Sequence, residues 1–141
     1  GEALSDEYLA YIKQVKTNAT ALAQFFVEKD YKIISGGTDN HLMLVDLRNK
    51  DISGKEAEAV LGKAGITTNK NMVPFDSRSP FVTSGVRFGT AAITTRGIGE
   101  AEILQIGQLI DEALVSRSDD AALAKIHDKV RTLMAEFPLY K

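Results

Sequence analysis

The sequence predicts an α+β fold in which a small, mostly antiparallel sheet packs against helices. Apolar residues recur at three- and four-residue steps in long segments near both ends of the chain, as in amphipathic helices. Short β-type segments bounded by turn-forming residues lie between these helices. The resulting order, α-β-β-α-β-β-α-α, has no sustained βαβ alternation, so a parallel sheet is not expected. The length of 141 residues fits a single domain over residues 1–141.

The first predicted element is a helix over residues 5–29. Ser5 is a suitable N-cap, and the carboxylates of Asp6 and Glu7 suit the positive end of the helix dipole. We expect one apolar stripe of this helix to face the core: Leu9, Ile12, Val15, Ala19, Leu22, Ala23 and Phe26.

A β-hairpin is predicted next, with strands over residues 31–35 and 41–47. The connecting residues 36–40, Gly-Gly-Thr-Asp-Asn, are dense in turn formers. A second helix is then expected after Ser53, because Ser at this position and Glu three residues later form a capping-box pattern. Gly65 is placed to end that helix in a left-handed conformation, and its core face is predicted to be Ala57, Val60, Leu61 and Ala64.

The remaining elements follow a long loop. A short strand over residues 66–70 leads into an irregular segment, residues 71–84, that is rich in hydroxyl side chains; loops of this length are often functional. A strand over residues 86–88 follows. Two helices over residues 100–116 and 119–137 end the chain, with Ser118 as the expected cap of the last helix and Pro138 as its stop. Their predicted core residues are Ile103, Leu104, Ile110, Ala113, Leu114, Leu123, Ile126, Val130, Leu133 and Phe137.

Composition argues against several classes of protein. The net charge is −2 and no basic face stands out, so neither nucleic-acid nor membrane partners are expected. The chain has no Cys and only two, widely separated His residues, which makes a metal site unexpected. No signal peptide or membrane span is recognisable, and a reducing, cytoplasmic location is expected. The chain begins one turn before a helix and without Met, which we interpret as a domain boundary left by truncation or proteolysis.

Three local patterns have both a structural and a functional interpretation. Residues 36–40 could cradle an anion through backbone N–H groups, but a hairpin turn is favoured because no helix begins there. Gly54 and Lys55 resemble the end of a phosphate-binding loop, but Asn49 stands where that motif needs Gly, so a helix N-terminus is favoured. His41 has no partner at catalytic or metal-binding spacing, and a structural hydrogen bond is the favoured role.

Arg87 is the strongest candidate for ligand binding. Its guanidinium group stays charged and its planar fork fits a carboxylate. The flanking residues Gly85 and Gly89 leave room for another backbone or a ligand. From this chemistry alone, a structural ion pair and a ligand site both remain open.

Three segments in order resemble blocks of serine hydroxymethyltransferases. The first is residues 35–47, which begins Ser-Gly-Gly-Thr-Asp-Asn-His. The second combines residues 54–58, Gly-Lys-Glu-Ala-Glu, with residues 66–71, Ile-Thr-Thr-Asn-Lys-Asn. The third is residues 79–90, Ser-Pro-Phe-Val-Thr-Ser-Gly-Val-Arg-Phe-Gly-Thr. With the flanking helices, the resemblance covers essentially the whole chain.

The resemblance implies the small C-terminal domain of a pyridoxal 5′-phosphate (PLP) enzyme with the type I fold of aspartate aminotransferase. The family interconverts serine and glycine with PLP and tetrahydrofolate. Arg87 matches the arginine that holds the substrate carboxylate, and Asn71 matches a residue that contacts the pterin of the folate. Ser79, Pro80 and Phe81 match a loop segment that lines the folate site.

The resemblance also implies what this chain lacks. The family's cofactor lysine follows Thr-Thr-His, whereas Lys70 follows Thr-Thr-Asn and aligns with a different segment, so we expect no catalytic residue in this chain. The isolated chain is expected to be inactive and to bind no PLP, and the parent enzyme is expected to be a cytoplasmic homodimer. The alternative hypothesis is a stand-alone ligand-binding or interaction module derived from this domain.

Overall fold

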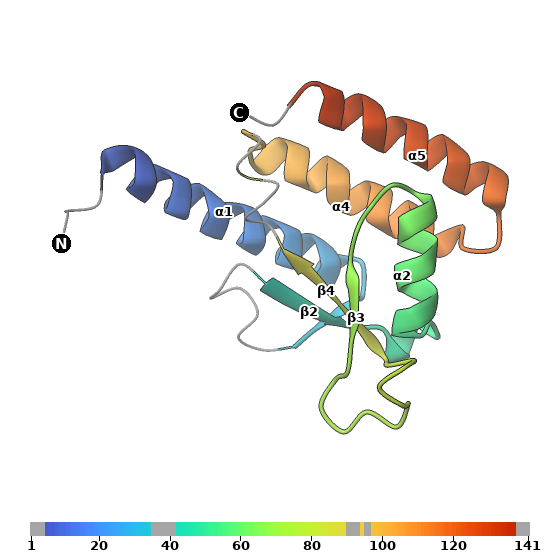
Figure 1. Ribbon diagram of the computed structural model, residues 1–141. Coiled ribbons are helices and arrows are strands. Elements are labelled where there is room, and N and C mark those ends of the chain that lie inside the picture. The colour runs from blue at the N-terminus through green and yellow to red at the C-terminus, as the bar shows by residue number, and fades with distance from the viewer. Residues whose placement is uncertain (1–4, 35–41, 90–93, 95–96, 138–141) are drawn as a thin grey trace.

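The computed structural model describes residues 5–34, 42–89, 94 and 97–137, and it has the predicted α+β architecture (Figure 1). Four helices and four strands are assigned within these residues. The helices are α1 (Asp6–Glu28), α2 (Gly54–Lys63), α4 (Glu100–Val115) and α5 (Asp120–Ala135), with a short 3-10 turn, η2 (Arg48–Lys50). The strands are β1 (Lys32–Ile33), β2 (Leu42–Asp46), β3 (Asn69–Asn71) and β4 (Gly85–Gly89).

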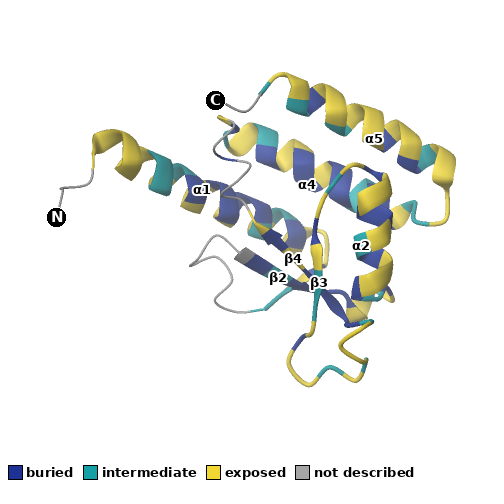
Figure 2. Ribbon diagram, in the orientation of Figure 1, coloured by how far each residue is buried: buried dark blue, intermediate teal, exposed yellow. Residues whose placement is uncertain are grey.

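The strands form one antiparallel sheet in the order β1-β2-β4-β3. In its register, Met43 lies opposite Phe88, and Val45 lies opposite Val86. All four of these side chains are buried, whereas Arg87 between them is exposed. One face of the sheet therefore packs against the helices, and the other does not (Figure 2).

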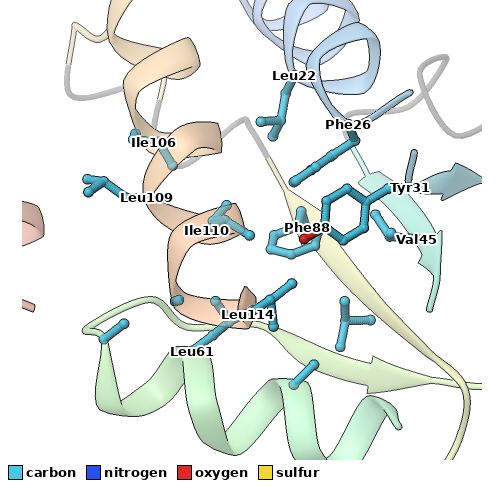
Figure 3. Packing of buried hydrophobic residues seen from close by; sticks show 14 of the residues in the cluster. Leu22, Phe26, Tyr31, Val45, Leu61, Phe88, Ile106, Leu109, Ile110 and Leu114 are labelled. Carbon is cyan, nitrogen blue, oxygen red and sulfur yellow. The ribbon is translucent and has the colours of Figure 1, made fainter. Parts of the chain in front are cut away.

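The core lies between that covered face and the helices. Figure 3 shows Phe26 of α1 beside Phe88 of β4, with Ile110 and Leu114 of α4 next to Phe88. The Phe26 ring centroid lies 5.4 Å from that of Phe88 and 5.3 Å from that of Tyr31. These side chains come from distant parts of the chain, so the core joins its two ends.

A buried amide reinforces the contact between α1 and the segment before α4. The Asn18 side chain is 0% exposed. Its Nδ2 donates to Thr94 Oγ1 at 3.0 Å and to the backbone oxygen of Ile98 at 2.9 Å. Gln14 Nε2 in turn donates to Asn18 Oδ1 at 2.8 Å. The amide is thus satisfied on both sides, as burial of a polar group requires.

The local signals in the sequence mark most helix ends correctly. Ser5 accepts a hydrogen bond from the Tyr8 N–H at 3.0 Å, and Ser53 accepts one from the Glu56 N–H at 3.0 Å. Gly65 adopts φ +81° directly after α2, as predicted. The four residues predicted to face the core from α2 are all buried.

Other expectations need correction. Asp119, not Ser118, caps α5, because its side chain accepts from the Ala122 N–H at 3.1 Å. Strand β3 begins at Asn69 and not at residue 66. The Ile66 N–H donates to the Leu61 oxygen at 2.8 Å, so Ile66 belongs to the turn that ends α2.

Two residues that were predicted to face the core are exposed. Leu9 is 49% exposed, since the first turns of α1 extend beyond the sheet and the other helices (Figures 1 and 2). Leu104 is 40% exposed, because α4 buries a broader surface centred on Ile106 and Ile110 against its neighbours. The prediction that Pro138 ends the last helix falls outside the described residues.

Candidate functional site

The uncovered side of the sheet, which we call the outer face, brings two of the predicted site residues together. Side chains alternate along a strand, so Arg87 points away from the face that carries Val86 and Phe88. The register pairs Arg87 with Asn69 on β3, which makes Asn71 its diagonal neighbour. Diagonal positions on adjacent antiparallel strands are about 7–8 Å apart. Arg87 and Asn71 therefore share the outer face within reach of one small ligand.

Within the described part of the chain, the Arg87 side chain makes no hydrogen bond and no ion pair. The carboxylate of Asp46 lies on the same face but is bound by Arg48, whose Nε donates to both carboxylate oxygens at 3.0 Å. Burial raises the pKa of Asp46, but hydrogen bonds from the Arg48 side chain and backbone outweigh it and lower that pKa overall. The negative charge of Asp46 is thus paired with Arg48. Among the described residues no other group pairs with Arg87, so its side chain is available to an external anion.

Gly85, the first residue of β4, is packed against other parts of the chain and not open to a ligand. A Cβ on Gly85 would lie 2.7 Å from Val73 Cγ1 and 2.9 Å from the Val45 oxygen. The room expected at Gly85 is therefore filled by the chain itself.

The loop between β3 and β4, residues 72–84, is organised by one carboxylate. Asp76 Oδ2 accepts from the backbone N–H groups of Ser84 at 2.8 Å and Val73 at 3.2 Å. Its Oδ1 accepts from Ser84 Oγ at 2.7 Å and from the Arg78 N–H at 2.9 Å. Desolvation raises the pKa of Asp76, but these hydrogen bonds more than compensate and lower it to about 2. A single ionised side chain thus ties together the start, the middle and the end of the loop.

The other predicted site residues lie on this loop. Ser79, Pro80 and Phe81 are all exposed, and the Phe81 side chain is 81% exposed. The Ser79 oxygen accepts from the N–H groups of Val82 and Thr83, at 3.0 and 2.8 Å, so a tight turn presents the three residues to solvent. Figure 1 shows the loop projecting beyond the end of the sheet, near the start of α2.

Sequence reasoning missed Asp76. The signal was present, because an Asp within an Asp-Ser-Arg-Ser run between two prolines is typical of a side chain that hydrogen-bonds nearby backbone N–H groups. The two other local patterns have different outcomes. Gly54 N–H and Lys55 N–H donate to Thr83 and Val82 oxygens at 3.0 and 2.9 Å, consistent with the favoured helix start. Residues 36–40 and His41 lie outside the described residues.

The sequence profile of serine hydroxymethyltransferase matches residues 1–110. The chain belongs to the serine hydroxymethyltransferase family. It is similar to serine hydroxymethyltransferases from Myxococcus xanthus (59% identical over 139 residues), Acinetobacter baylyi (51% over 140 residues) and Acinetobacter baumannii (50% over 139 residues). Each comparison covers 99% of this chain but only 33–34% of the relative. The chain therefore spans about a third of the length of these members of the family.

Lys70 is not placed to hold the PLP that the resemblance implies. Lys70 lies opposite Val86 in the sheet, so its side chain leaves β3 on the helix side and not on the outer face. Its Nζ lies 3.8 Å from Glu58 Oε1, and its N–H donates to Glu58 Oε2 at 3.0 Å. Lys70 is held against α2, on the opposite side of the sheet from Arg87. We therefore derive no step that passes through PLP on this chain.

Two kinds of feature are absent from the described residues. They contain no group of three or more His, Cys, Asp or Glu side chains arranged to hold a metal ion. None of their helices is both long enough and apolar enough to cross a membrane.

Proposed function

We propose that this chain is the C-terminal part of a serine hydroxymethyltransferase, where it binds the substrate carboxylate and one side of the folate. The parent enzyme would interconvert serine and glycine with PLP and tetrahydrofolate. One observation carries the proposal: Arg87 is exposed, without a partner among the described residues, and next to Asn71 on the outer face. Membership of the serine hydroxymethyltransferase family supports the proposed reaction.

Arg87 would act by binding and orienting the amino acid. A guanidinium holds a carboxylate through two parallel N–H···O bonds, a geometry that fixes direction as well as position. Such a charge-assisted contact contributes about 1.5–3 kcal/mol when shielded from water. Arg87 cannot act as a base near neutral pH, so its contribution is limited to positioning the reacting carbon.

The folate would lie against Asn71 and the loop. The Asn71 Nδ2 already donates to the Met72 oxygen at 2.9 Å, so its side-chain oxygen is the free acceptor for an N–H group on a heterocycle. The exposed Phe81 ring and the neighbouring Pro80 offer apolar surface for a flat ring. These residue types match an amphipathic ligand with a polar, aromatic head.

The rest of the enzyme would supply the chemistry. We propose that no residue of this chain attaches PLP, that the isolated chain is inactive, and that the cytoplasmic parent enzyme is a homodimer. Support for the first two points comes from the position of Lys70 and from the chain's coverage of a third of its relatives.

The test is substitution of Arg87 in the full-length enzyme. Arg87→Ala should lower kcat/KM for serine and glycine about tenfold to a hundredfold, as expected from the loss of ~1.5–3 kcal/mol. Arg87→Lys should rescue only part of this loss, because an ammonium group lacks the planar fork. PLP absorbance and the melting temperature should not change.

Arg131→Ala is the matched control, since Arg131 is exposed on α5 and pairs only locally with Asp128 at 2.7 Å. It should leave amino-acid kinetics unchanged. A lower melting temperature in Arg87→Ala, with equal losses for substrates with and without a carboxylate, would instead assign Arg87 a structural role. The stand-alone module hypothesis predicts that the isolated chain binds its ligand as tightly as the full-length protein does.

A further inference from the structure

We infer that Asp76 is a positioning residue for folate binding: its carboxylate holds the 72–84 loop in the conformation that presents Ser79, Pro80 and Phe81. The inference rests on the proposed function, because it assigns those three residues to the folate. Asp76 itself is not expected to touch the ligand. It acts through the backbone of the loop.

The geometry requires a carboxylate at this position. Four donors converge on Asp76, two on each oxygen, and the donors belong to Val73, Arg78 and Ser84. An ionised carboxylate has acceptors only, so both oxygens can serve. Asparagine would replace one oxygen by an NH₂ group, which would face two donors and could accept from neither. Asp76→Asn therefore removes two hydrogen bonds while almost preserving the shape of the side chain.

The end of the loop also has anchors that do not involve Asp76. The Val82 and Thr83 oxygens accept from the first N–H groups of α2, and Thr83 is 2% exposed. Arg78 Nη1 donates to Ser84 Oγ at 3.2 Å. Loss of Asp76 would therefore loosen the segment leading to the tip while β4 and α2 stay in place. The expected defect is local and leaves the fold intact.

Apolar packing contributes little to holding the tip of the loop. Phe75 is 100% exposed and Phe81 is 81% exposed, so neither ring is buried against the body of the domain. Phe75 also adopts φ +57°, a left-handed conformation that a bulky side chain disfavours. Asp76 Oδ2 accepts hydrogen bonds from the N–H groups of Val73 and Ser84, which lie on either side of Phe75 in the chain, and these bonds help to hold this conformation.

The experiment is a double-mutant cycle in the full-length enzyme, with Asp76→Asn, Phe81→Ala and the double variant. The probes are tetrahydrofolate and glycine, titrated separately by calorimetry. We expect Asp76→Asn to weaken tetrahydrofolate binding about tenfold and glycine binding less than twofold, with Phe81→Ala also selective for the folate. In the Asp76→Asn background, Phe81→Ala should cost less than it does alone, because the ring is no longer presented.

Asp119→Asn is the control for the chemical change, since Asp119 is another carboxylate that accepts from a backbone N–H, and Asn is also a good N-cap. It should leave both affinities unchanged. Strictly additive effects of Asp76→Asn and Phe81→Ala, or equal losses for tetrahydrofolate and glycine, would overturn the positioning role while leaving the proposed function standing. Failure of Phe81→Ala to affect folate binding would refute the proposed folate contact, and the role of Asp76 with it.

Discussion

Two glycines of α2 are predicted to respond in opposite directions to the same substitution. Gly54 begins the helix and is buried, whereas Gly62 near its end is exposed. A Cβ on Gly54 would lie 2.0 Å from Thr83 Oγ1 and 2.3 Å from the Gly85 oxygen. A Cβ on Gly62 would have no atom within 4 Å outside its own helix. The two sites therefore separate steric crowding from helix propensity.

The Gly54→Ala clash cannot be relieved by a simple side-chain rotation. The Gly85 oxygen is backbone of the central strand β4 and accepts from Thr83 Oγ1 at 3.2 Å, and Thr83 is itself held at φ +59°. Crowding of this kind costs about 1–3 kcal/mol, and the gain in helix propensity offsets at most about 1 kcal/mol of it. We expect a net loss of about 1–2 kcal/mol. Gly62→Ala should gain about 0.5–1 kcal/mol.

The assay is urea unfolding of the 141-residue chain, followed by far-UV circular dichroism. The two variants should shift the midpoint in opposite directions with similar m-values, because the exposed surface of the unfolded chain hardly changes. The reasoning fails if Gly54→Ala is as stable as the unsubstituted chain, or if Gly62→Ala is destabilised to the same extent as Gly54→Ala.

Three further outcomes are expected. The isolated chain should unfold in one cooperative thermal transition, because capped helices and the sheet share a single core; a gradual, featureless melt would contradict this. The free energy of unfolding should fall as the pH drops from about 4 to about 2, because the pKa of Asp76 is lowered in the folded state from 3.8 to about 2. The stabilisation from ionised Asp76 is complete above the unfolded pKa and is lost as the pH falls through the folded pKa, so urea titrations of Asp76→Asn should show a flatter pH dependence. PLP added to the isolated chain should give no visible absorbance that survives dialysis, and a stable band that disappears in Lys70→Ala would contradict the assignment of that lysine to the ion pair with Glu58.

The sequence predicts well those features whose cause is local. Ser5 and Ser53 mark helix starts because a cap needs only an oxygen near the first N–H groups. Gly65 marks a helix end because few other residues adopt its left-handed conformation without strain. The start of β3 was misplaced because the turn after α2 uses residues whose own composition suggests a strand.

Features that depend on distant partners were less accessible. Periodicity shows that Leu9 belongs to an apolar stripe, but it cannot show where the rest of the chain stops covering α1. The pairing of β4 with both β2 and β3 is a long-range choice, and it alone determines that Arg87 and Asn71 share a face. The roles suggested for both residues came from resemblance to a family and not from the spacing of the residues.

The hydrogen bond between Asn18 and Ile98 has a consequence for how the chain is made. Its two ends are 80 residues apart, so at about 5–20 residues per second the ribosome delivers the acceptor roughly 4–16 s after the donor. During that interval the Asn18 side chain has left the ribosome without its native acceptor on Ile98. Most of the stability of a helix in a protein comes from tertiary packing of its apolar face. The α1 helix of the nascent chain therefore gains this part of its native packing only after the segment before α4 has been synthesised.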